Sequence, residues 1–260
     1  MPQKTAAILA IGDELLSGRT RDANMHYLAG WLTERGVALR EARIVGDERG
    51  MIVSALNELR ARYDYVFTSG GIGPTHDDIT ADAVSAAFGV PCVHHPEAKA
   101  MIERWYRARG LEATPARLRM ARMPDGAELI LNPVSGAPGV RMENVFVLAG
   151  VPEIFKAMLA AVDAAIARGP VTHARAATVE GLPESALADG LAAIQAAHKA
   201  VVIGSYPIGG DTGGVTVVAR SEDAAAAESV IEKVTAMMRA LGGEPRLGER
   251  SQMRDGGGGR

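Results

Sequence analysis

The segment SGGIGPTHDDIT, from Ser69 to Thr80, combines residue types with opposite chemical preferences. Gly70 and Gly71 can take positive φ angles and, having no side chains, let a ligand approach the backbone closely. A glycine turn that leads into a helix suits a phosphate, because free N–H groups and the helix dipole favour an anion there. Asp77 and Asp78 place negative charge in the same segment, and carboxylates repel phosphate.

A divalent cation would reconcile these preferences. Magnesium is typically bound by one or two carboxylates together with substrate phosphates, and it neutralises charge that develops on a phosphoryl oxygen. The segment therefore predicts a site for a metal and a nucleotide-like phosphate. A plainer interpretation also stands, in which the glycines form a tight turn and the acids complement the helix dipole. The P-loop pattern G-x-x-x-x-G-K-[ST] and the pattern G-x-G-x-x-G are both absent, so the standard ATPase and dinucleotide signatures are not supported.

The elements that position this segment alternate along the chain. Short apolar runs predict buried strands over residues 5–12, 37–45 and 65–69. Apolar spacing predicts helices over 22–35, around 52–59 and over 80–88, with Gly36 and Gly89 where helices should end. This alternation predicts a three-layer αβα architecture around a mostly parallel sheet. Ligands of such sheets bind at the carboxyl ends of the strands, where the segment lies.

The rest of the chain predicts a second, smaller domain. Helices are expected over 96–109 and 115–122, strands over 129–134 and 144–150, and a helix from Pro152 that buries Phe155, Met158, Leu159, Val162 and Ile166. We expect an α/β domain over 1–169, a small α+β domain over 170–246 and a flexible tail over 247–260. The small domain should contain strands over 173–181, 200–205 and 214–220, a helix over 184–197, and a last helix that buries Val230, Val234, Met237, Met238 and Leu241.

Composition narrows the classes of partner. A net charge of −3 gives no basic field for nucleic acid. The single cysteine, Cys92, excludes an intramolecular disulfide and fits a reducing compartment. Because Cys92 follows Pro91 in a short apolar run, we expect it to be a buried structural thiol. No signal-peptide pattern and no apolar run of about 18 residues is present. We therefore expect a cytoplasmic protein that binds neither membrane nor nucleic acid.

Two further motifs have plain interpretations. His94, His95 and Glu97 are metal-binding residue types, but their spacing is irregular and a helix-entry loop before Pro96 is favoured. The segment GGDTGG, residues 209–214, could bind an anion, but its place between two strand patterns favours a turn.

Five stretches together resemble a known family. SGGIGPTHDDIT resembles the signature of the molybdopterin-binding fold of molybdenum-cofactor biosynthesis proteins. With it, the stretches AIGDELLSGRTRDAN, VGDERG, NPVSGAPGV and LAGVPEIF resemble more closely the N-terminal part of the competence/damage-inducible CinA proteins. GLPESAL and IGSYP resemble the small KH-like domain that follows in that family. The loop EGLPES is acidic and has one glycine, which argues against RNA binding. The chain departs from the family at Ala149, usually proline, and at Asp13, usually threonine, and the amidase domain of longer relatives is not in this sequence.

The resemblance implies an enzyme, a metal-dependent pyrophosphatase acting on ADP-ribose or FAD-like dinucleotides. The alternatives are a molybdopterin-binding or adenylyl-transfer protein, and a scaffold with a vestigial site. Asp78 is the first candidate for the metal-linked catalytic residue, with Asp77 beside it. Further candidate ligands of a divalent ion, Mg²⁺ first among them, are Glu14, Asp13 and Asp82. The expected contacts to the phosphate-bearing nucleotide or pterin come from Gly70, Gly71, Gly73, Thr75, Asn24, Ser135, Gly136, Gly139 and Gly150. A homo-oligomer is implied on the same basis.

Overall fold

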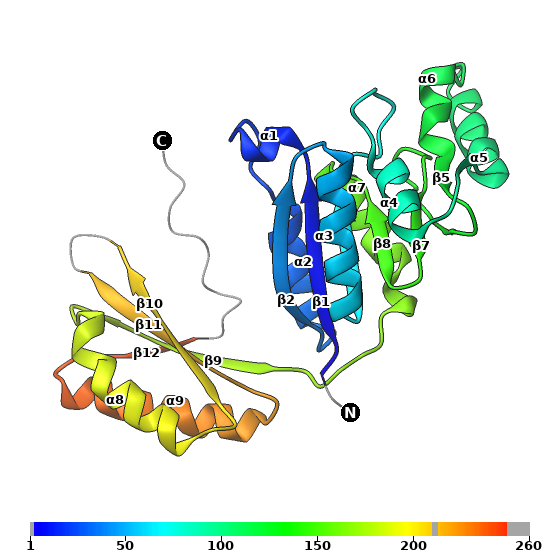
Figure 1. The fold of residues 1–260 in the computed structure, drawn as a ribbon. Helices are drawn as coiled ribbons and strands as arrows, with labels where there is room; N and C mark the ends of the chain where they lie inside the picture. Colours follow the sequence, from blue (N-terminus) through cyan, green and yellow to red (C-terminus); the bar gives the residue numbers. More distant parts are fainter. Residues whose placement is uncertain (1–2, 210–212, 249–260) are drawn as a thin grey trace. The chain divides into compact units, whose positions relative to one another are not determined.

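The computed structural model describes residues 3–209 and 213–248 of the chain. It divides into two compact units, Met1–Gly169 and Pro170–Arg260, and Figure 1 shows the elements of each. Each unit has its own sheet and its own hydrophobic core. No helix within the described residues is long and apolar enough to cross a membrane.

The sheet of the first unit is mostly parallel, as predicted. Its strand order is β2-β1-β3-β8-β7-β6. The strands β1 (Thr5–Ile11), β2 (Ala38–Val45), β3 (Tyr65–Ser69) and β8 (Val145–Leu148) are parallel, and β7 (Gly139–Met142) and β6 (Glu128–Ile130) complete the sheet in antiparallel pairing. Because the parallel strands all end at one edge, the loops that follow them are close together.

Helices cover both faces of this sheet and make it the middle of three layers (Figure 1). The helices α3 (Arg49–Arg62) and α4 (Thr80–Phe88) pack with Ala7, Leu9 and Ile11 of β1. The helices α2 (Asn24–Thr33) and α7 (Pro152–Ala161) pack with Ala6 and Ile8 of the same strand. Successive side chains of a strand point to opposite faces, so a strand covered on both sides is apolar throughout. The predicted three-layer α/β class is confirmed, and the five apolar residues expected to be buried from Phe155 onwards are buried.

An excursion between α4 and β6 differs from the prediction. It contains β4 (Cys92–His94), α5 (Pro96–Arg107), α6 (Pro115–Leu118), a 3₁₀ turn η1 (Arg119–Ala121) and β5 (Arg122–Pro124), and β4 pairs with β5. The predicted helix over 115–122 therefore ends early, because residues 119–121 form the 3₁₀ turn and Arg122 begins β5. The predicted strand over 129–134 stops at Ile130, because the Asn132 side chain accepts the N–H groups of Val134 and Ser135 and turns the chain.

The second unit is α+β, as predicted. An antiparallel sheet in the order β10-β11-β9-β12 consists of β9 (His173–Glu180), β10 (Val202–Ile208), β11 (Gly214–Ser221) and β12 (Arg246–Gly248). The helices α8 (Glu184–Ala197) and α9 (Ala224–Ala240) contribute to its core. Leu241, expected to be buried, is 44% exposed because it follows the helix end. Leu247 and Gly248 of the expected tail belong to β12; the tail from residue 249 and residues 210–212 of the expected turn lie outside the described residues.

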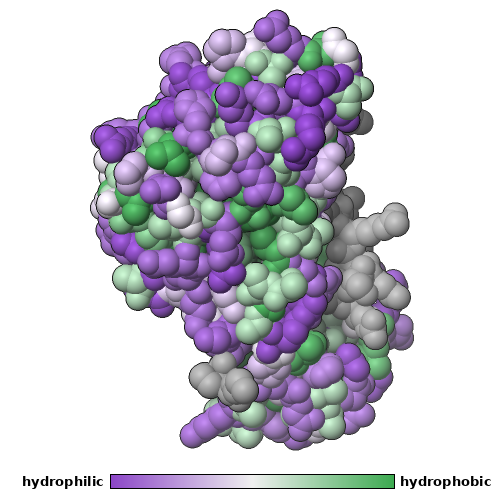
Figure 2. All heavy atoms as spheres, turned by 90° about the vertical axis from the view of Figure 1, so that its right-hand side faces the viewer, coloured by the Kyte–Doolittle hydropathy of each residue, from purple (hydrophilic) through white to green (hydrophobic). Residues whose placement is uncertain are grey.

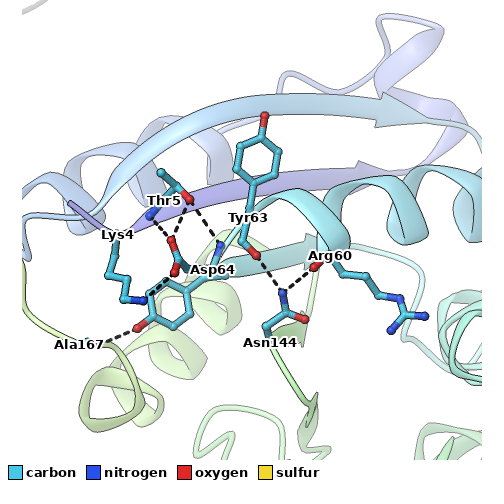
Figure 3. A network of polar contacts seen from close by, with 8 residues as sticks. Lys4, Thr5, Arg60, Tyr63, Asp64, Asn144 and Ala167 are labelled. Carbon is cyan, nitrogen blue, oxygen red and sulfur yellow. Dashed lines mark hydrogen bonds and ion pairs between the residues drawn. The ribbon is translucent and has the colours of Figure 1, made fainter. Parts of the chain in front are cut away.

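A polar network holds the first unit together at the amino end of its parallel strands, and Figure 3 shows its residues. Asp64 accepts hydrogen bonds from Lys4 Nζ at 2.7 Å, from the Thr5 N–H at 2.8 Å and from the Thr5 hydroxyl at 2.9 Å. The Asn144 side-chain amide donates to the carbonyls of Arg60 and Tyr63. These contacts fix the starts of β1, β3 and β8 relative to one another and so help set the register at their far ends.

Candidate functional site

The glycine segment follows β3 at the carboxyl edge of the sheet, and its first glycines serve close packing. The Gly70 N–H donates to the Leu148 carbonyl at 3.2 Å. Gly70 has a φ of 106°, and a Cβ there would lie 2.2 Å from the Ile11 carbonyl oxygen. The buried Thr80 donates its hydroxyl to the Gly70 carbonyl and its N–H to the Gly71 carbonyl, each at 3.0 Å. The ends of β1, β3 and β8 and the start of α4 are thus joined at this turn.

Asp78 folds back onto the segment instead of capping the helix. Its carboxylate accepts the Gly73 N–H at 2.7 Å, the Thr75 N–H at 2.8 Å and the Thr75 hydroxyl. The N-cap position of α4 is Ile79, which makes no side-chain cap, and Asp78 directly precedes it. The N–H groups of Gly73 and Thr75, expected to meet a phosphate, are occupied by this carboxylate. A carboxylate has about four lone-pair sites, so Asp78 keeps capacity for a further ligand.

Asn24 links two of the loops at this edge. It is 4% exposed, and its amide nitrogen donates to the Ser69 hydroxyl at 2.8 Å and to the Gly150 carbonyl at 2.7 Å. A Cβ on Gly150 would lie 3.3 Å from the Cα of Gly70. The structure therefore brings Asn24, Gly70 and Gly150 together, as the ligand prediction required, but the donors of Asn24 are used within the protein.

A group of carboxylates lies at the ends of β1 and β2. A short helix, α1 (Asp13–Leu16), follows β1, and Figure 1 shows it at the same end of the unit as the loop before α4. The Asp13 N–H donates to the Asp47 carboxylate at 3.0 Å, and the Asp47 N–H donates to the Asp13 carboxylate at 3.3 Å. Partial burial raises the pKa of Asp47, and the negative charges of Asp13, Glu14 and Asp77 raise it further. We call Asp13, Glu14 and Asp47 the acidic group.

Sequence reasoning did not name Asp47 as a site residue. The available signal was its place in VGDERG, directly after a predicted strand of the same parallel sheet. The neighbouring Asp77 is exposed, and hydrogen bonding from Thr75 lowers its pKa.

Other predicted site residues lie elsewhere or are engaged. Asp82, expected to bind metal, is in an ion pair with Arg122 at 2.5 Å. The Ser135 hydroxyl accepts a hydrogen bond from Asn132 at 2.6 Å. Gly136 lies against the ring of Trp105, and Gly139 is a buried residue of β7 that faces the Val147 carbonyl. Ser135 and Gly136 are thus engaged within the protein, whereas Pro138 and Gly139 line a cavity beside the glycine segment.

A small cavity opens beside the glycine segment. Its lining includes Gly71, Gly73, Asp78, Asp82 and Gly139, with Arg119 and Arg122 from the excursion. Its volume of about 30 Å³ accommodates water but not a nucleotide. A larger ligand would have to contact this cavity from its mouth.

The oxygen donors at this edge fit a hard divalent cation. Within residues 3–209 and 213–248, no three His, Cys, Asp or Glu side chains are arranged to hold a metal by themselves. Magnesium commonly takes one or two carboxylates and completes its shell with water and substrate phosphate. The acidic group supplies oxygen donors, and its mutual repulsion at Asp47 is the effect that a bound cation would offset.

His95, one of the residues of metal-binding type in the sequence, has a structural role. Its side chain accepts the Ala98 N–H at the start of α5, which confirms the helix-entry interpretation.

The fold and this edge define a class: an α/β domain with a glycine–aspartate loop at the carboxyl ends of parallel strands. Residues 7–168 match the family described as "probable molybdopterin binding domain". The chain belongs to this family, and the predicted resemblance is confirmed. Residues 179–242 match the family described as "FAD synthase, middle domain".

Individual relatives place the chain among CinA-like proteins. A CinA-like protein of Myxococcus xanthus is 38% identical over 210 residues, which cover 76% of this chain and 50% of that protein. A protein of Pyrobaculum aerophilum is 39% identical over 212 residues, which cover 78% of this chain and 80% of the relative. The crystal structure of the protein CinA from Thermoplasma acidophilum, described as of unknown function, is 34% identical with a TM-score of 0.58 and covers 62% of this chain and 97% of that one.

Proposed function

We propose that the chain is a divalent-metal-dependent hydrolase that splits the diphosphate of ADP-ribose or FAD-like dinucleotides. The observation that carries the proposal is the acidic group, placed at the same sheet edge as the glycine segment and Asp78. The match of residues 179–242 to a domain of FAD synthase supports a nucleotide of this kind.

The residues of the site divide into two roles. One or two of the carboxylates of Asp13, Glu14 and Asp47 would hold a divalent cation together with water and the substrate phosphates. The cation would supply charge neutralisation on the phosphoryl oxygens and a more acidic water. Asp78 holds the glycine loop in shape through Gly73 and Thr75 and has capacity left for the cation or its water. In the reaction, a water oxygen forms a bond to one phosphorus, and the bond from that phosphorus to the bridging oxygen breaks. The two products are AMP and a second phosphate monoester.

Release of AMP from ADP-ribose and FAD in the presence of Mg²⁺ tests this proposal. Asp78→Asn and Asp47→Asn should each lower the rate at least about a hundredfold, in the range lost when one electrostatic group is removed from an active site. Asp125→Asn is the matched control, because Asp125 is an exposed aspartate of the same unit with no side-chain partner among the described residues. If Asp78→Asn and Asp47→Asn release AMP at the same rate as the Asp125→Asn control, the proposal is wrong.

A second candidate is molybdopterin binding or adenylyl transfer to molybdopterin. The match of residues 7–168 to the molybdopterin-binding family favours it. Calorimetric titration with molybdopterin and with ADP-ribose separates the two candidates. Tighter binding of molybdopterin, with no AMP release from dinucleotides, would favour the second.

Two further points need separate tests: the competing hypothesis of a scaffold, and the oligomeric state. A scaffold with a vestigial site would show no change in melting temperature when Mg²⁺ and ADP-ribose are added together, whereas the hydrolase should be stabilised by mass action. A homo-oligomer is proposed from family membership, and light scattering after size exclusion gives its mass directly.

A further inference from the structure

An open groove lies next to the cavity of the glycine segment, on the excursion between α4 and β6. It is lined by His94, Lys99, Pro115, Leu118, Arg119 and Arg122. Arg119 and Arg122 also line the cavity that contains Gly71, Gly73 and Asp78. The two hollows therefore share a wall. Figure 2 views the side of the molecule that carries α5 and α6, and hydrophilic side chains predominate in its upper part.

The two shared arginines differ in how their charges are used. Arg122 is neutralised by Asp82 at 2.5 Å. Among the described residues, Arg119 pairs with no carboxylate and its side chain donates no hydrogen bond, although it is half-buried. A guanidinium carries five donors in a planar fork that matches phosphate oxygens. Arg119 is thus a charge without an acceptor, on the wall between the cavity and the groove.

The polar side chains in the rest of the groove lining are basic, and they lie beside the apolar Pro115 and Leu118. The lining contains no acidic residue, and Lys99 has a single distant acidic neighbour, Glu103 at 3.9 Å. An ion pair of that length on an exposed helix contributes little, so the ammonium of Lys99 remains available to a ligand. His94, exposed at the end of β4, adds a further nitrogen.

We propose that this groove is a second anion site, in which Arg119 and Lys99 bind one phosphate of a nucleotide diphosphate while the other lies at the mouth of the glycine-segment cavity. The proposal rests on the proposed function for the identity of the ligand. The two phosphates of a diphosphate share one bridging oxygen, so two anion sites with a common wall suit a diphosphate better than a monophosphate. Arg119 is then a residue that determines specificity for diphosphates.

The test compares the binding of two probes by calorimetry in Mg²⁺: the non-hydrolysable diphosphate α,β-methylene-ADP, and AMP. The wild-type chain should bind the diphosphate more tightly. Arg119→Gln should weaken diphosphate binding about tenfold or more, the loss expected for a hydrogen-bonded charge, and change AMP binding by less than about threefold. Lys99→Gln, at an exposed position, should weaken diphosphate binding about threefold and serves if Arg119→Gln does not fold.

Arg117→Gln is the matched control. Arg117 lies two residues before Arg119, stacks on Tyr106 and donates to the Glu112 carbonyl, and it does not line the groove. Its replacement should leave the binding of both probes within about twofold of wild type. Equal binding of the two probes by the wild type, or unchanged diphosphate binding in both Arg119→Gln and Lys99→Gln, would overturn the second anion site.

The outcome is independent of hydrolysis. A diphosphate preference that disappears in Arg119→Gln, in a chain that releases no AMP from ADP-ribose, would support the anion site and count against the hydrolase. AMP release together with an unchanged preference in Arg119→Gln would support the hydrolase and overturn the anion site.

Discussion

The carboxylates of Asp13 and Asp47 each accept the backbone N–H of the other residue, at 3.3 and 3.0 Å. This reciprocal contact joins the chain after β1 to the chain after β2 and holds two negative charges close together. The result is a group of acids at the carboxyl edge of the sheet, in which the charges of Asp13, Glu14 and Asp77 repel that of Asp47.

Asp47→Asn should stabilise the metal-free protein. The pKa of Asp47 is raised in the folded state, so its ionised form is less favourable there than in the unfolded chain. The stability linked to this group is present below the unfolded pKa and is lost as pH rises through the folded pKa. The melting temperature in EDTA at pH 7 should therefore be higher for Asp47→Asn than for the wild type. Added Mg²⁺ should narrow or reverse this difference, and a lower melting temperature of the variant in EDTA would contradict the repulsion.

Gly70→Ala and Gly73→Ala should have different consequences. A Cβ on Gly70 meets the Ile11 backbone at a positive φ, whereas a Cβ on Gly73 meets the Asp78 carboxylate at 2.7 Å. Gly70→Ala should cost roughly 2–3 kcal/mol in urea unfolding, because backbone must move. Gly73→Ala should displace the Asp78 side chain, with a smaller loss of stability and a larger loss of AMP release. The same stability loss in both variants would show that Asp78 is not held by this loop.

Asp64 provides a prediction at the opposite edge. Hydrogen bonds from Lys4 and Thr5 lower the pKa of Asp64 to about 2. The stabilisation is present above the unfolded pKa of about 4 and is lost as pH falls through about 2. Asp64→Asn should cost roughly 1 kcal/mol at pH 7, a value reduced for solvent screening, and the cost should vanish near pH 2. Unfolding free energies measured from pH 7 to pH 2, with Asp125→Asn as control, give the comparison.

The bounds of some helices and strands could be predicted from the sequence because a glycine ends each of them. The bounds of β3 and α4 match the prediction residue for residue, since Gly70 ends the strand and Gly89, at a φ of 68°, ends the helix. The three-residue strands β4 and β5 have no periodicity long enough to detect, and they form because residues about thirty positions apart in sequence pair with each other.

The site was harder to predict than the fold. The sequence singles out Asp78 within the glycine segment, but its bonds to Gly73 and Thr75 depend on a loop conformation that no spacing rule specifies. Asp82 lies about one turn further along, and its position predicts a further metal ligand that supports Asp78. The ion pair of Asp82 with Arg122 involves a residue 40 positions away, and only the folded chain brings the two together.

The most direct measurement is the Mg²⁺-dependent release of AMP from ADP-ribose by the wild-type chain and by Asp78→Asn, with Asp125→Asn as control. A metal-dependent hydrolase at the glycine segment predicts AMP release that disappears in EDTA, falls at least about a hundredfold in Asp78→Asn and is unchanged in the control. No AMP from ADP-ribose or FAD at high protein concentration, or the same metal-dependent rate in Asp78→Asn, would contradict it.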